Sequence, residues 1–153
     1  ILPRQLLVLA TRLYLDVLFG DPPFYELAWV GAFDHFGFCG SKGLRGSPEG
    51  RHAGMVKLLG AAELRSLFAP FRLFGMPMVF GMHLFVTAGQ AWATLEASLP
   101  FQDQGPSATF GVGTGLLLRW GEAVMVRIET AYSPDATDAG LPVGIYFELD
   151  FAY

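Results

Sequence analysis

Alternation of apolar and polar side chains is the feature that most limits how this chain can fold. In the segment Gln5–Phe19 the odd positions from Leu7 onward are apolar except Thr11, whereas Arg12 and Asp16 occupy even positions. A period of two predicts a β-strand with one apolar and one polar face. Five further segments alternate in the same way: Met55–Arg65, Met76–Trp92, Ala108–Trp120, Val124–Tyr132 and Val143–Tyr153. The sequence therefore predicts an all-β chain of about six strands.

Composition narrows the class of β-protein. Apolar residues make up 52% of the chain and the mean hydropathy is +0.41, yet no apolar run is long enough for a transmembrane helix. A transmembrane β-barrel combines these properties because only every second residue faces lipid. A soluble β-sandwich is the alternative. The net charge of −4 argues against nucleic-acid binding, and the single cysteine, Cys39, excludes an intrachain disulfide.

Connections between the predicted strands differ in length. We expect long loops at 20–51, 95–106 and 133–142, shorter connections at 67–75, and a tight turn at Gly121-Glu122. Outer-membrane barrels place short turns on the periplasmic side and long loops outside, which favours an antiparallel transmembrane barrel over a sandwich. Six strands are too few to close such a barrel, so we expect either more strands before Ile1 or assembly of several chains.

The glycine-rich stretch Gly43–Arg51 carries the most specific motif. Its residues Leu44, Arg45, Gly46 and Ser47 resemble the (V/I/L)-R-G-(F/Y) motif in the sixth extracellular loop of the BamA/TamA-type outer-membrane assembly factors. This bacterial surface antigen superfamily also includes two-partner-secretion transporters. The resemblance implies a sixteen-stranded outer-membrane barrel, of which residues 1–153 form the C-terminal portion and roughly the last six strands.

The resemblance also implies partners for the loop arginine inside the barrel. Arg45 matches the arginine that reaches into the lumen, and Glu63 matches the acidic residue on the following strand. The next strand carries F-x-D-x-G in the family and reads Phe85-Val86-Thr87-Ala88-Gly89 here. Because Thr87 replaces the aspartate, we expect Glu63 to be the only carboxylate of the pair and Thr87 to accept a neutral hydrogen bond. Ser47 replaces the final aromatic residue of the motif.

The function implied by the resemblance is assembly, insertion or translocation of other outer-membrane proteins without covalent chemistry. The implied partners are the lipid bilayer, client outer-membrane proteins and accessory lipoproteins. Client strands would pair at a seam that is formed by the last strand, whose outward residues are Val143, Ile145, Phe147, Leu149, Phe151 and Tyr153. The alternative is a secretion pore or the membrane-anchor barrel of a fused, patatin-like enzyme.

Enzymatic activity of this chain itself is not expected. A hydrolase that uses His83 is conceivable, but the serines have no companion pattern for a catalytic triad, and a lone histidine is commonly a polar residue of a barrel interior. No cofactor motif or metal-ligand spacing is present in the sequence. The pairing of Arg45 with Glu63 could equally serve only to fix the loop inside the lumen.

Overall fold

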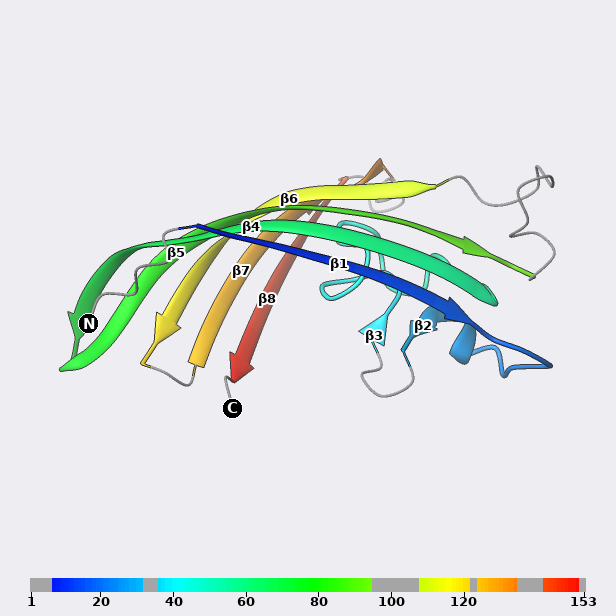
Figure 1. Cartoon of the computed structure of the whole chain (residues 1–153), viewed down its shortest axis with the longest axis horizontal. Helices are drawn as coiled ribbons and strands as arrows, with labels where there is room; N and C mark the ends of the chain where they lie inside the picture. Colours follow the sequence, from blue (N-terminus) through cyan, green and yellow to red (C-terminus); the bar gives the residue numbers. More distant parts are fainter. Residues whose placement is uncertain (1–6, 32–35, 95–107, 122–123, 135–141, 152–153) are drawn as a thin grey trace.

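The computed structural model describes residues 7–31, 36–94, 108–121, 124–134 and 142–151, and these build an antiparallel sheet of six strands (Figure 1). The strand order is β1-β4-β5-β6-β7-β8. Strands that follow one another in the chain are therefore neighbours in the sheet, and two short strands, β2 and β3, lie outside it. The six strands are β1 (Val8–Val17), β4 (Val56–Leu73), β5 (Met76–Trp92), β6 (Thr109–Trp120), β7 (Val124–Tyr132) and β8 (Val143–Phe151). This confirms the prediction of an all-β, antiparallel chain.

The segment between β1 and β4 folds over one face of the sheet. It contains a 3-10 turn, η1 (Glu26–Ala28), and a small antiparallel pair, β2 (Trp29–Val30) and β3 (Phe36–Gly37). Figure 1 shows β2, β3 and the following loop on the concave side of the arched sheet. Their apolar side chains form one buried cluster with two residues of the sheet: Val30, Phe36, Phe38, Cys39, Leu44, Leu59 and Ala91. The hydrophobic core thus lies between this segment and the concave face, which we call the inner face.

The connection that the sequence predicted at Leu67–Gly75 is wrong. Strand β4 continues to Leu73, and only Phe74 and Gly75 form the turn to β5, with φ of 52° and 79°. Positive φ at both central residues is the requirement of a type I′ hairpin turn. Pro70 was misleading because proline is tolerated where a strand has a free edge. In the described residues, β1 pairs with β4 only as far as Arg65, and Pro70 lies beyond that point.

The opposite, outer face of the sheet is apolar and exposed. Its exposed apolar side chains come from all six strands: Leu9, Leu13, Leu15, Leu58, Leu64, Met82, Leu84, Val86, Phe110, Val112, Leu116, Ile128, Ile145, Phe147 and Leu149. Val56 and Met78, which the alternation of β4 and β5 places on the same face, are buried. The register explains this, because Val56 lies between Val17 and Trp92 and Met78 lies between Phe71 and Trp120.

The remaining strand predictions agree with the structure at β5 and β7. The predicted residues Gln5, Glu122 and Tyr153 lie outside the described residues, as do the whole loop 95–106 and most of the loop 133–142. Within the described ranges, no helix has both the length and the apolar character needed to span a membrane.

Candidate functional site

A tight loop presents Arg45 to the inner face. The amide of Leu44 donates to the carbonyl of Phe38 at 2.7 Å, and the amide of Gly40 donates to the carbonyl of Leu44 at 3.1 Å. Gly43 sits so close to this backbone that a Cβ atom would lie 2.2 Å from the Phe38 carbonyl oxygen. Only glycine fits there, which accounts for the glycine before the motif. Because the buried side chains of Phe38 and Leu44 anchor the loop, Arg45 is held at a fixed position.

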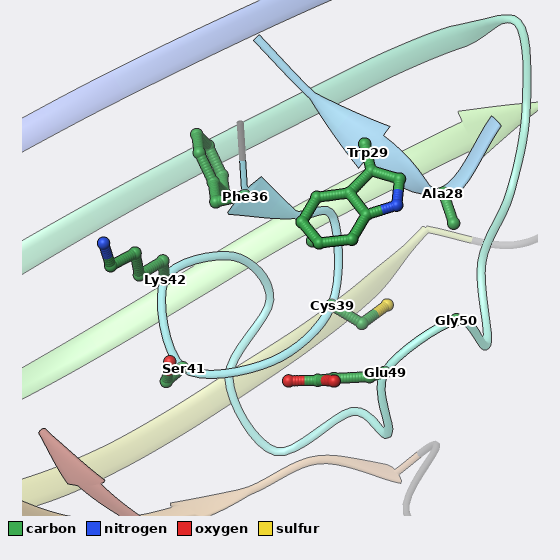
Figure 2. A pocket seen from close by; sticks show the side chains of 9 residues that line it. Ala28, Trp29, Phe36, Cys39, Ser41, Lys42, Glu49 and Gly50 are labelled. Atoms are coloured by element: carbon green, nitrogen blue, oxygen red, sulfur yellow. The ribbon is translucent and has the colours of Figure 1, made fainter. Parts of the chain in front are cut away.

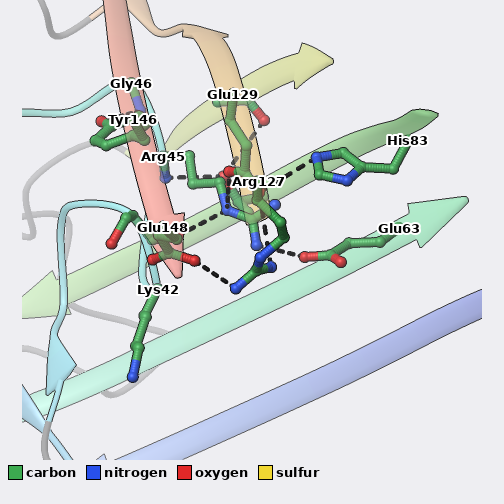
Figure 3. A network of polar contacts seen from close by, with 12 residues as sticks. Lys42, Arg45, Gly46, Glu63, His83, Arg127, Glu129, Tyr146 and Glu148 are labelled. Carbon is green, nitrogen blue, oxygen red and sulfur yellow. Dashed lines mark hydrogen bonds and ion pairs between the residues drawn. The ribbon is translucent and has the colours of Figure 1, made fainter. Parts of the chain in front are cut away.

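The guanidinium of Arg45 lies between two carboxylates on different strands. Its Nη2 atom is 2.5 Å from Oε1 of Glu63 on β4, and its Nε atom is 3.3 Å from Oε2 of Glu129 on β7. Nε also donates to the carbonyl of Ser41 at 2.7 Å, and Cζ lies 4.3 Å from the centre of the Phe85 ring. Figure 3 shows Arg45, Glu63 and Glu129 converging over the inner face. Arg45 is only 2% exposed, so water does not solvate its charge. The two buried carboxylates balance that charge instead.

The backbone of the motif is bound as well as its side chain. The amide of Arg45 donates to Oγ1 of Thr87 at 3.3 Å, and this hydroxyl donates to the carbonyl of Gly111 at 3.3 Å. The amide of Gly46 donates to the hydroxyl oxygen of Tyr146 on β8 at 2.9 Å. Gly46 has φ of 90°, and a Cβ atom there would lie 2.9 Å from Ser133. The motif therefore contacts every strand from β4 to β8.

Glycines on the inner face make room for the loop. A Cβ atom at Gly111 would lie 1.8 Å from the carbonyl oxygen of Arg45, and one at Gly89 would lie 2.9 Å from the Phe38 ring. At Gly113 and Gly115 a Cβ atom would meet the side chains of Phe85 and His83 at 2.4 and 2.7 Å. The backbone of β6 is thus open to the loop that packs on the inner face. The buried side chain of Arg45 can therefore lie across β5 and β6 on that face.

The two carboxylates that hold Arg45 belong to a longer row of charges. Glu63 also accepts from Arg65 at 2.5 Å, and Glu129 lies 3.6 Å from Arg127. Arg127 continues the row to β8, where it binds Glu148 and lies 2.7 Å from Asp150. Nε2 of the buried His83 is 3.3 Å from Glu129. Cations and anions alternate across the inner face, so no carboxylate in the row lacks a basic neighbour.

A second contact fixes the first part of the loop. Lys57 on β4 is 1% exposed and pairs with Asp16 on β1 at 2.9 Å. Its ammonium group also donates to the carbonyls of Glu26 and Leu27 at 3.2 and 3.4 Å. The 3-10 turn is therefore attached to the sheet at a point separate from Arg45.

Predicted and observed partners of Arg45 agree only in part. Glu63 and Phe85 contact its side chain, and Thr87 accepts a neutral hydrogen bond, although from the backbone amide. Gly89 lies under Phe38 instead of Arg45. Glu63 is the only carboxylate of the expected pair, but a second carboxylate that the motif did not predict, Glu129 on β7, also binds Arg45. Ser47 is buried at the position of the expected aromatic residue.

Glu129 and Tyr146 are the site residues that sequence reasoning missed. Both belong to one row of the register, in which Arg65, His83, Gly115, Glu129 and Tyr146 are consecutive cross-strand partners on the inner face. The sequence feature that could have indicated Glu129 is the pair of glycines at 113 and 115. Their lack of side chains leaves space beside an inward-facing glutamate. That signal has meaning only once the register is known.

The predicted seam strand lies at one edge of the sheet. β8 pairs with β7, and its other edge has no partner among the described residues. Val143, Ile145, Phe147 and Leu149 are exposed on its outer side, whereas the position of the Phe151 side chain is not described. In the parts of the chain that the structure covers, no group of three His, Cys, Asp or Glu residues could hold a metal ion.

Comparison of the chain with protein-family models, curated proteins and solved structures gave no match. The site is therefore interpreted from its own geometry and from the motif. A motif whose arginine is buried between two carboxylates, and whose residues together contact five strands, is suited to hold a loop against a sheet. Removing one partner of such a buried pair typically costs about 3–5 kcal/mol, which is large on the scale of a domain's stability.

Proposed function

We propose that this chain is part of a bacterial outer-membrane β-barrel that assists the assembly, insertion or translocation of other outer-membrane proteins, without covalent chemistry. The observation that carries the proposal is the buried contact of Arg45 with Glu63 and Glu129 on the face opposite an exposed apolar surface. In this proposal the inner face borders the barrel lumen, and the segments 18–31 and 36–55 lie inside it.

The outer face supports a membrane location. Exposed apolar residues on all six strands form a surface far more extensive than the isolated apolar side chains of ordinary protein surfaces. The six strands have 9 to 18 residues, and about 9–11 residues of a tilted strand cross the hydrocarbon layer of a bilayer. Exposing such an apolar face to water costs free energy, whereas contact with lipid does not.

Strand connections support the same topology. The turn between β4 and β5 consists of two residues, whereas the segment between β1 and β4 is long and folded. These two connections lie at opposite ends of the sheet, as the short periplasmic turns and long outer loops of a membrane barrel do. The free edges of β1 and β8 would be paired with further strands, because unpaired backbone groups are prohibitively costly in lipid.

A depletion experiment tests the assembly role. Production of the full-length protein would be shut off in its own bacterium, and the abundance of other outer-membrane β-barrel proteins would be measured by quantitative mass spectrometry. We expect these proteins to decline while periplasmic and inner-membrane proteins keep their levels. Re-expression of the wild type should restore them, and re-expression of Arg45→Ala should restore them less well than the exposed control Arg72→Ala.

The same experiment separates assembly from the alternative of a pore or membrane anchor. If depletion leaves other outer-membrane proteins unchanged, the assembly role is wrong. The proposal of a membrane barrel still stands in that case, provided that the protein fractionates with the outer membrane in cells that produce it. If the protein is recovered outside the membrane fraction, the barrel proposal is wrong as well.

A further inference from the structure

A pocket of about 520 Å³ lies within the folded segment between β1 and β4, and it adjoins the Arg45 site at Ser41, whose carbonyl accepts from Arg45. Its aromatic walls are Trp29 and Phe36, from the paired strands β2 and β3, and its charged residues are Lys42 and Glu49. Figure 2 shows these four side chains around the loop that also carries Cys39 and Ser41. The volume is within the range of about 300–1,000 Å³ that is usual for small-molecule sites.

Walls of this pocket are held by backbone contacts. The amide of Phe38 donates to the carbonyl of Ala28 at 2.9 Å, next to the paired residues Trp29 and Gly37. On the other side, Cys39 and Leu44 form a β-bridge that closes the loop containing Ser41 and Lys42. The pocket is therefore a preformed site, which reduces the entropy lost when a ligand binds.

Glu49 is positioned over the loop by a glycine. A Cβ atom at Gly40 would lie 3.1 Å from Cγ and 3.2 Å from Oε1 of Glu49, so a larger residue would displace the carboxylate. Gly40 has φ of 112°, which also favours glycine. The side chains of Lys42 and Glu49 make no hydrogen bond or ion pair with the described residues, including each other. In Figure 2 Glu49 lies below the Trp29 ring, and Lys42 lies to its left with its ammonium group directed away from the ring.

We propose that this pocket binds a small zwitterion, with a primary ammonium group at one end and a phosphate or carboxylate at the other. Glu49 and the face of Trp29 would receive the ammonium group, since carboxylates and aromatic faces both attract cations. Lys42 would receive the anionic group, and Phe36 would contact the short apolar body between them. Ethanolamine phosphate, the headgroup of a common lipid, and a short peptide with free termini share this chemistry.

Isothermal titration calorimetry on the full-length protein in detergent tests this inference with two probes, O-phosphoethanolamine and the dipeptide Gly-Phe. We expect at least one probe to bind and its N-acetylated analogue to bind about fivefold to tenfold more weakly, because each exposed ion pair contributes roughly 1 kcal/mol. Glu49→Gln and Lys42→Met should each weaken the zwitterion by a similar factor. Only Lys42→Met should weaken the acetylated analogue, because that analogue retains the anionic end alone.

Matched controls are the exposed residues Asp21 and Arg72, which lie outside the pocket: Asp21→Asn and Arg72→Met should bind like the wild type. Binding of one probe alone identifies the source of the ligand, and binding of both supports the shared chemistry. Failure of both probes to bind, or equal binding by Glu49→Gln and Asp21→Asn, overturns the inference. These outcomes leave the assembly role untouched, because that role depends on Arg45 and is measured in depleted cells.

Discussion

Arg45 connects Glu63 on β4 to Glu129 on β7, although strands β5 and β6 lie between them. One side chain can cover this span because Phe85 supports it from below and Gly113 and Gly115 leave the sheet open beside it. The loop is thus held by the middle of the sheet and not by a single neighbouring strand. This arrangement leads to predictions that separate the contribution of each contact.

Replacing Arg45 by alanine should loosen the loop while the sheet stays folded. The substitution leaves Glu63 and Glu129 buried without their shared cation, at a cost of about 3–5 kcal/mol. We expect much faster proteolysis between Phe24 and Arg51, measured by limited digestion in detergent. Arg72→Ala, an exposed arginine beside the β4–β5 turn, should digest like the wild type. Equal digestion of both variants would mean that Arg45 does not hold the loop.

The two carboxylates should act as a unit. After Glu63→Gln, Arg45 still contacts Glu129, and the reverse holds after Glu129→Gln. The double variant should therefore lose more stability than the sum of the single losses, with a coupling of about 0.5–3 kcal/mol. Urea unfolding followed by tryptophan fluorescence gives the four free energies of unfolding. Additive losses would show that Arg45 depends on only one of the two groups.

Gly111→Ala should displace the loop, because its Cβ atom would lie 1.8 Å from the carbonyl oxygen of Arg45. The Cβ atom is bonded directly to Cα and the carbonyl oxygen belongs to the backbone, so neither can rotate away, and we expect a loss of about 1–3 kcal/mol from overpacking. Gly60→Ala is the matched control, since its Cβ atom would be 3.8 Å from the nearest side chain on the outer face. The control should be neutral or slightly stabilising. A wild-type melting temperature for Gly111→Ala would contradict the close approach.

Tyr146→Phe removes the hydroxyl oxygen that accepts from the amide of Gly46 and keeps the ring. An amide left without a partner in a buried site costs about 1–3 kcal/mol, so the Gly46 amide should exchange with deuterium ten- to a hundredfold faster. Tyr132→Phe, on the outer face, is the control. Unchanged exchange at Gly46 in Tyr146→Phe would show that β8 does not contribute to holding the motif.

Sequence patterns predicted the strands well because alternation depends only on which face each residue occupies. They failed at Leu67–Gly75, where Pro70 indicated a break although the edge position removes its cost. The motif predicted the contact between Arg45 and Glu63. Glu129 and Tyr146 could not be predicted, because their positions depend on the register across several strands, and no local pattern encodes that register.

The most direct test of the central claim is the lipid accessibility of the outer face. A nitroxide label would replace Leu84, Ile145 or Asp150 in turn, in a Cys39→Ser background, and power saturation would be measured in lipid vesicles. Leu84 and Ile145 are exposed on the outer face, and Asp150, with a side chain 46% exposed, lies on the inner face. If the proposal is right, the labels at Leu84 and Ile145 collide mainly with oxygen dissolved in lipid, and the label at Asp150 collides mainly with a water-soluble nickel complex. Equal access of the nickel complex to all three positions would contradict a membrane barrel.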